Sequence, residues 1–88
     1  MHATKRWSVA IEIDEHDGRT RAVARLEGGA AELTGVGLAR RSPEDPDVPQ
    51  IGDELAVARA LSELSHQLLD ATAADIEKVT HQPAHVRI

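Results

Sequence analysis

The N-terminal part of the chain alternates between apolar and polar residues, which is the pattern of half-buried β-strands. Between Trp7 and Ile13, for example, every odd-numbered residue is apolar and large. A second alternating segment covers residues 19–27, and a third runs from about residue 31 to 40. We therefore predict three antiparallel strands in a meander, at about 6–14, 19–27 and 31–40.

Residues 15–18 predict a four-residue turn between the first two strands, because Gly18 suits a left-handed backbone conformation. This turn would place Ile13 beside Thr20. On the other face it would bring opposite charges together, each pair contributing about 0.2–1 kcal/mol. The predicted charge pairs are Asp14–Arg19, Glu12–Arg21 and Arg6–Glu27.

Gly28-Gly29 predicts a two-residue hairpin turn into the third strand. The pairs expected across it are Leu26–Ala31, Ala24–Leu33 and Arg25–Glu32. Continued alternation turns Gly35 and Gly37 toward the core and Val36 and Leu38 outward. A β-bulge at these glycines is the alternative, and it would turn Leu38 inward.

A loop at 42–48 leads into a segment with helical periodicity, which predicts one helix over about 49–80 and a tail at 81–88. Pro49 suits the first helical position. One apolar stripe comprises Ile51, Leu55, Ala58, Ser62, Ser65, Leu69, Thr72, Ile76 and Val79. A second comprises Val57, Leu61, Leu64, Leu68 and Ala71. A restart of the helix near Thr72, where a capping box can be recognised, is the alternative to one continuous helix.

This helix carries more apolar surface than three short strands can cover. It would span about 45 Å, whereas nine-residue strands span about 30 Å. We therefore expect a homodimer or a higher homo-oligomer, because monomers rarely expose so large an apolar patch. The alternative is a strongly twisted sheet that wraps around both stripes. The candidate self-association residues are Val57, Leu61, Leu64, Leu68, Val23, Val36 and Leu38.

The composition narrows the classes of function. The 88 residues include no cysteine, and Trp7 is the only aromatic residue, so disulfides and thiolate metal sites are excluded. The acids between 44 and 54 do not have the spacing of an EF-hand. No serine, histidine or glycine has the neighbours that catalysis or phosphate binding requires. We expect no enzymatic activity, no cofactor and no metal.

The chain also lacks targeting features. Its N-terminal residues are not followed by the apolar run of a signal peptide. No stretch approaches the about 20 apolar residues that a membrane-spanning helix needs. These observations predict a cytoplasmic protein.

Arginines gather on the outer face of the predicted sheet, where they form a candidate surface for polyanions such as RNA. The net charge of −5 argues against a general attraction to nucleic acid. Cross-strand pairing with acids of the same face is the alternative interpretation. The candidate polyanion-binding residues are Arg19, Arg21, Arg25, Arg40 and Arg41.

Several segments are distinctive when taken together: Asp17-Gly18-Arg19-Thr20-Arg21-Ala22, Leu33-Thr34-Gly35, Ala39-Arg40-Arg41-Ser42-Pro43, residues 45–56 and Ala58-Arg59-Ala60-Leu61. Over roughly residues 7–81, the chain resembles an actinobacterial family of small uncharacterised proteins grouped under a domain of unknown function. The resemblance implies a β-β-β-α fold similar to the double-stranded-RNA-binding domain without its first helix. Where that domain carries lysines at the start of its RNA-contacting helix, this chain has Ile51-Gly52-Asp53-Glu54.

The resemblance also implies a role in the dormancy and low-oxygen response of mycobacteria. A likeness of such proteins to ribosome hibernation factors implies action at the ribosome, and the family implies no catalytic residues. We therefore predict a non-enzymatic stress or dormancy factor that associates with the ribosome. The alternative is a homo-oligomeric protein-interaction module with no nucleic-acid role.

Overall fold

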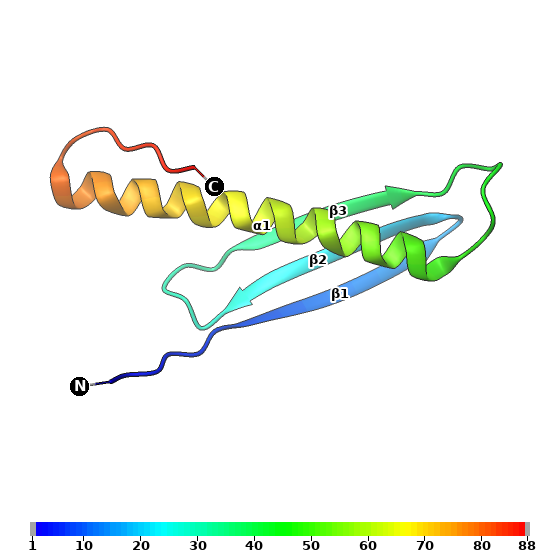
Figure 1. The fold of residues 1–88 in the computed structure, drawn as a ribbon, viewed down its shortest axis with the longest axis horizontal. Helices are drawn as coiled ribbons and strands as arrows, with labels where there is room; N and C mark the ends of the chain where they lie inside the picture. Colours follow the sequence, from blue (N-terminus) through cyan, green and yellow to red (C-terminus); the bar gives the residue numbers. More distant parts are fainter. Residues whose placement is uncertain (1, 88) are drawn as a thin grey trace.

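The computed structural model describes residues 2–87. Strands β1 (Ser8–His16), β2 (Arg19–Glu27) and β3 (Thr34–Arg40) form one antiparallel sheet in the order β1-β2-β3. The helix α1 (Pro49–Thr80) follows β3 and crosses one face of this sheet (Figure 1). The predicted α+β fold, a three-stranded meander followed by one long helix, is confirmed.

The predicted register between β1 and β2 is wrong by two residues. Ile13 lies opposite Ala22 instead of Thr20, because the connecting turn contains only Asp17 and Gly18. These residues have φ angles of 50° and 71°, as a type I′ hairpin turn requires. The preference of Asp-Gly for this turn outweighs charge pairs worth about 0.2–1 kcal/mol each. A shift of two leaves every side chain on its predicted face.

The register between β2 and β3 is also two residues from the predicted one. Ala24 lies opposite Gly35, and the Leu26 amide donates to the Leu33 carbonyl at 2.9 Å. Residues 28–33 form a longer loop in place of the two-residue turn, so β3 begins later than predicted. Its pairing with β2 continues without a bulge, and Gly35 and Gly37 face inward as the alternation predicts.

Small residues set the distance between α1 and the sheet. The line of α1 that touches the sheet begins at Gly52, which faces Thr20 of β2, and continues through Ala56 and Ala60, which face β3. A Cβ atom on Gly37 would overlap the Ala56 carbonyl oxygen, and one on Gly35 would overlap that of Ala60. This close approach is available only because glycine has no side chain. The contact line therefore lies beside the first predicted stripe and meets the second at Leu64.

The buried core is correspondingly small. It consists of Ala22, Ala24, Ala39, Ala56, Ala60 and Leu64. Leu26, Leu33 and Val57 pack partly buried against it. Large apolar side chains therefore remain at the periphery of the core.

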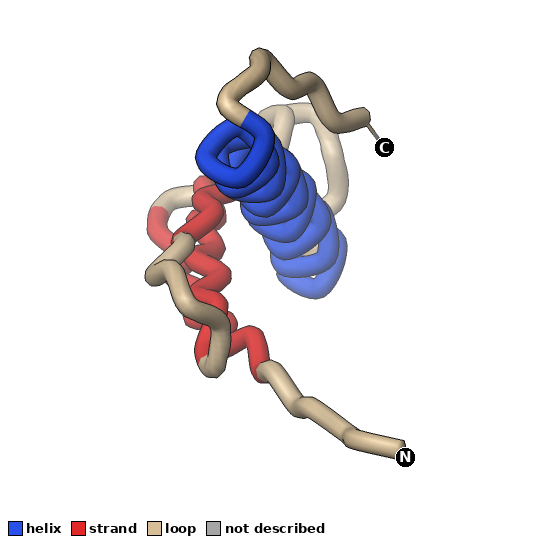
Figure 2. Tube along the Cα trace, turned by 90° about the vertical axis from the view of Figure 1, so that its left-hand side faces the viewer, coloured by secondary structure: helices blue, strands red, loops and turns tan. Residues whose placement is uncertain are grey.

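The helix α1 is continuous through Thr72, whose hydroxyl donates to the Leu68 carbonyl at 2.8 Å. The predicted alternative of a restart there is wrong, because this threonine bonds back within the helix. Viewed end-on, α1 and the sheet contact each other on one side and diverge toward the N-terminal segment (Figure 2). No helix among residues 2–87 has the length and apolarity needed to cross a bilayer.

Candidate interaction surface

Polar side chains of α1 occupy the free edge of β3. Glu63 accepts a hydrogen bond from the Val36 amide at 2.8 Å. Gln67 donates to the Thr34 carbonyl at 2.8 Å, and Arg59 donates to the Leu38 carbonyl at 2.6 Å. The three helical residues are spaced four apart, so they project from the same side of α1. Three backbone groups of this edge thus have partners within the protomer.

Strand β1, at the opposite edge, is left uncovered. The helix packs mainly against β3 and β2 and barely touches β1. All residues of β1 are exposed, although its inner face carries Val9, Ile11 and Ile13. These three side chains are 41%, 38% and 42% exposed, and Trp7 just before them is 55% exposed. Residues with the pattern of a strand core thus lie at the surface.

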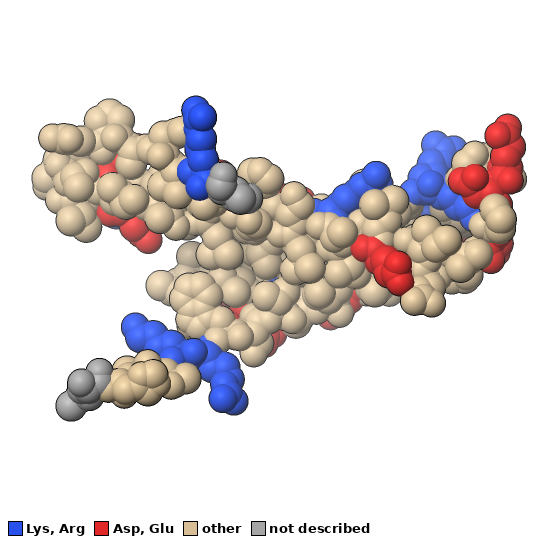
Figure 3. Space-filling view, in the orientation of Figure 1, with Lys and Arg blue, Asp and Glu red and all other residues tan. Residues whose placement is uncertain are grey.

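One side of α1 continues this apolar surface. With about 100° of rotation per residue, Val57, Leu61 and Leu68 lie on the side of α1 opposite Glu63, and therefore toward β1. Leu61 is exposed, while Val57 and Leu68 are half-buried. The face that carries α1 shows few charged side chains in its middle (Figure 3). We call Trp7, Val9, Ile11, Ile13, Val57, Leu61 and Leu68 the apolar surface.

The predicted self-association residues are divided between the two faces of the sheet. Val57, Leu61 and Leu68 belong to the apolar surface, whereas Leu64 is only 3% exposed and is part of the core. Val23 and Val36 lie opposite each other on the outer face, half-buried. Leu38, on the same outer face, is 61% exposed.

Sequence reasoning missed the contribution of Trp7, Val9, Ile11 and Ile13, because alternation alone assigned them to the covered face. The signal that could have identified their exposure is the run of small residues at 52, 56 and 60 together with Gly35 and Gly37. That run draws the helix to β3 and away from β1.

Four of the five candidate arginines share the outer face: Arg19, Arg21, Arg25 and Arg40. We call this set the arginine face. All four side chains are exposed, and Arg19 lies directly opposite Arg40. Within residues 2–87, none of them has a carboxylate within ion-pair distance. The predicted pairs Asp14–Arg19 and Glu12–Arg21 do not form, because the shifted register separates them. It places Asp14 opposite Arg21 instead, without an ion pair among the described residues.

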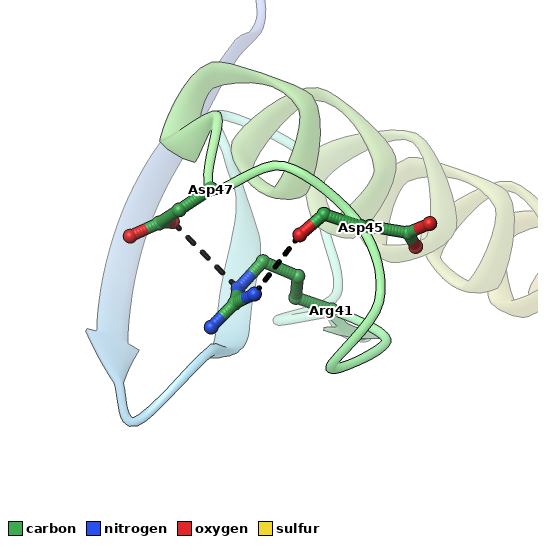
Figure 4. Close-up of polar contacts among 3 residues, drawn as sticks. All are labelled: Arg41, Asp45 and Asp47. Carbon is green, nitrogen blue, oxygen red and sulfur yellow. Dashed lines mark hydrogen bonds and ion pairs between the residues drawn. The ribbon is translucent and has the colours of Figure 1, made fainter.

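Arg41 lies apart from the arginine face and holds the loop before α1. Its guanidinium donates to the Asp45 carbonyl at 3.1 Å and lies 3.7 Å from a carboxylate oxygen of Asp47 (Figure 4). The loop borders an open cavity of about 350 Å³ beside the start of α1. The Arg41 guanidinium is therefore engaged by Asp45 and Asp47 of its own loop.

Metal-binding chemistry finds no support in this arrangement. Within the described part of the chain, no three histidine, aspartate or glutamate side chains lie close enough together to hold a metal ion. The acids before and within the start of α1 are dispersed over an exposed loop and the first turns.

Similarity to known proteins agrees with this fold. Residues 5–85 match the family model described as Rv2632c-like. The uncharacterized protein Mb1767 of Mycobacterium bovis is 58% identical over 85 residues, which cover 97% of this chain and 90% of that protein. The uncharacterized protein Rv2632c of Mycobacterium tuberculosis is 55% identical over 82 residues, covering 93% and 88%.

A crystal structure of Rv2632c is similar to this chain with a TM-score of 0.84 and 55% identity, covering 93% of this chain and 98% of that one. The relatives confirm the prediction of an uncharacterised actinobacterial family.

Proposed function

We propose that this chain, which belongs to the Rv2632c-like family, is a non-enzymatic, cytoplasmic interaction module that works as a homodimer. The observation that carries the proposal is the apolar surface formed by β1 and one side of α1. Contiguous apolar patches of this kind are typical of protein–protein contacts. The protomer has a core built mostly of alanine, so a second copy would supply the burial that a short chain lacks.

The free energy available from burying the apolar surface supports association. Full burial of a valine, leucine or isoleucine side chain contributes about 1.5–3 kcal/mol. Side chains such as Ile11 and Leu61, which are 38% and 40% exposed, retain less than half of that, or about 1 kcal/mol each. Summed over two copies of the apolar surface, this gain can offset the cost of association, which is about 4–15 kcal/mol.

The test is sedimentation of the purified protein at micromolar concentration. We expect a dimer for the natural chain and a monomer for Ile11→Asp and for Leu61→Asp, because each places a charge in the apolar surface. Leu38→Asp is the matched control: it alters a more exposed apolar residue, at 61%, on the outer face, and should leave the dimer intact. A monomeric natural chain contradicts the proposal, and loss of the dimer in Leu38→Asp alone would assign the interface to Val23, Val36 and Leu38.

A second candidate function is that of a stress or dormancy factor that binds the ribosome through the arginine face. Its support is that Arg19, Arg21, Arg25 and Arg40 are exposed together without carboxylate partners within residues 2–87. Arginines of this kind bind the phosphates of RNA. The β-β-β-α order resembles the double-stranded-RNA-binding architecture without its first helix, and this resemblance adds support to the proposal. The acidic residues Asp53 and Glu54 at the start of α1 make the sheet, and not the helix, the expected RNA contact.

Ribosome co-sedimentation from oxygen-starved cells tests this second function. We expect the natural chain to sediment with ribosomes and the triple variant Arg19→Glu/Arg21→Glu/Arg25→Glu to remain in the supernatant. Arg41→Glu is the control, because Arg41 lies apart from the arginine face and is paired with Asp47. A natural chain that does not sediment with ribosomes, or a triple variant that still does, eliminates this function and leaves the interaction module.

A further inference from the structure

The geometry points to a specific mode of dimerisation: two β1 strands pair antiparallel across a two-fold axis at Ala10, which joins two sheets into one. This inference rests on the homodimer proposed above, and it names the partner as a second copy of the same chain. Its first basis is the difference between the two edges of the sheet. The β3 edge is occupied by Arg59, Glu63 and Gln67 of α1, whereas β1 is exposed along its whole length. An uncovered strand edge is a template for another strand.

The hydrogen-bonding pattern shows which groups of β1 are available. In an antiparallel sheet, successive residues direct their backbone groups alternately to one side and the other. Leu26 donates to Leu33 beyond the start of β3, so its backbone groups point away from β1. Its partner Val9 must then direct its own backbone groups to the free edge, as must Ile11 and Ile13 by the same alternation. Backbone groups and apolar side chains of the same residues are thus both available to a second copy.

Charge complementarity selects the register. With the axis at Ala10, and with residues 5–7 extending the strand that begins at Ser8, Arg6 would lie opposite Asp14 of the second copy and Lys5 opposite Glu15. Each pair occurs twice by symmetry, and opposite charges across strands contribute about 0.2–1 kcal/mol. Moving the axis to Val9 keeps one kind of ion pair, Arg6 with Glu12. Moving it to Ile11 also keeps one, Lys5 with Asp17 of the turn, and leaves Arg6 opposite a histidine. Placing the axis between residues would set apolar side chains against the polar face.

The same register builds a continuous apolar row across the axis. Val9 lies opposite Ile11 of the second copy, and Trp7 lies opposite Ile13. Side chains at directly opposed positions approach within about 5 Å, so these pairs shield one another from water. The row runs along the face that carries α1, bordered on each side by Leu61 of one helix.

Disulfide trapping tests the register, and the chain is suited to it because it contains no natural cysteine. In the inferred dimer the two Ala10 residues form a non-hydrogen-bonded pair with Cα atoms about 4.5 Å apart, within the range of disulfides. We expect Ala10→Cys to oxidise to a covalent dimer. Ser8→Cys and Glu12→Cys, on the same face of the same strand, would lie roughly 14 Å from their own copies and should remain reduced. The double variant Ser8→Cys/Glu12→Cys should cross-link again.

Sedimentation of the reduced proteins separates this inference from the homodimer itself. A dimer in which Ala10→Cys fails to cross-link, or in which Ser8→Cys links equally well, overturns the strand pairing and leaves the homodimer standing. A monomer without cross-linking overturns both. Cross-linking confined to Ala10→Cys and the double variant supports both.

A backbone variant tests the strand pairing independently of cysteine. Ile11→Pro removes an amide that points to the free edge, where proline is tolerated within the protomer. We expect its circular dichroism to be unchanged while its dimer dissociation constant rises roughly 100-fold. A folded Ile11→Pro that dimerises as tightly as the natural chain overturns the inference.

Discussion

The two edge strands of the sheet differ in whether their outward backbone groups are covered by the helix. At β3, the helix lies so close that Gly37 has no room for a side chain, and Arg59, Glu63 and Gln67 bond to the exposed backbone. At β1, the helix is absent and the strand exposes Val9, Ile11 and Ile13. The first edge is partly occupied by side chains of the protomer, and the second is open.

This difference separates the size of a side chain from its burial. The residues that pack the helix onto the sheet are mostly glycine and alanine, while isoleucine and tryptophan lie at the surface. Because dispersion contacts depend on separation, a helix and a strand that lie close together can pack well without large side chains between them. The larger apolar side chains are thereby left for association with another molecule.

The largest expected effect is on the β3 side, from Gly37→Val. A side chain there would overlap Ala56 and Ala60 of α1, forcing the helix away from β3 and lowering the free energy of unfolding by about 3 kcal/mol. Urea denaturation measures the change. The control is Gly29→Ala in the loop before β3, where the added Cβ would meet the mobile end of Leu26 at 3.3 Å; its cost should be about 1 kcal/mol or less. Equal stability of the two variants would show that the close approach does not hold the two layers together.

A smaller effect is expected from Glu63→Ala. Its carboxylate accepts from the Val36 amide at 2.8 Å and from Gln67 at 3.2 Å. Loss of these bonds should lower the free energy of unfolding by about 1–2 kcal/mol and speed hydrogen exchange at the Val36 amide. Asp70→Ala, an exposed acid on the same helix, is the control and should change stability by about 0.5 kcal/mol or less. Unchanged exchange at Val36 would mean that the helix does not protect this edge.

The smallest effect is expected from Arg41→Ala, at the start of α1 and outside both edges. The Arg41 and Asp47 side chains are 38% and 69% exposed, and exposed ion pairs contribute about 1 kcal/mol or less. We expect a loss within that range, and added salt should diminish it further because salt screens the pair. A loss as large as that of Gly37→Val would place the loop before α1 among the elements that determine the fold.

Sequence periodicity was sufficient for the order of the elements, for the bounds of α1 and for the faces of the strands. It failed on register because the intrinsic turn preference of Asp17-Gly18 is stronger than the summed charge pairs. Sequence periodicity also failed to identify the contact line of α1, because apolar stripes are defined by large residues such as leucine and isoleucine. The residues that decide that contact are Gly35, Gly37 and their small partners on the helix.

The candidate surface was predicted in part for the same reason. An excess of apolar area on α1 follows from its length and stripes, and Leu61 does lie at the surface. The exposure of β1 depends on where the helix settles across the sheet, which no local pattern specifies. The arginine face, by contrast, follows from alternation alone, and it is preserved when the register shifts by two.

Occupation of the β3 edge by α1 has a consequence for how large an assembly can grow. Fibres of stacked strands require each subunit to offer two acceptor edges, one for the subunit before it and one for the next. Here one edge is terminated by side chains of the same polypeptide, so joining through β1 uses the remaining one. Growth by strand addition then ends at a dimer. The helix that packs the protomer thus also prevents open-ended polymerisation.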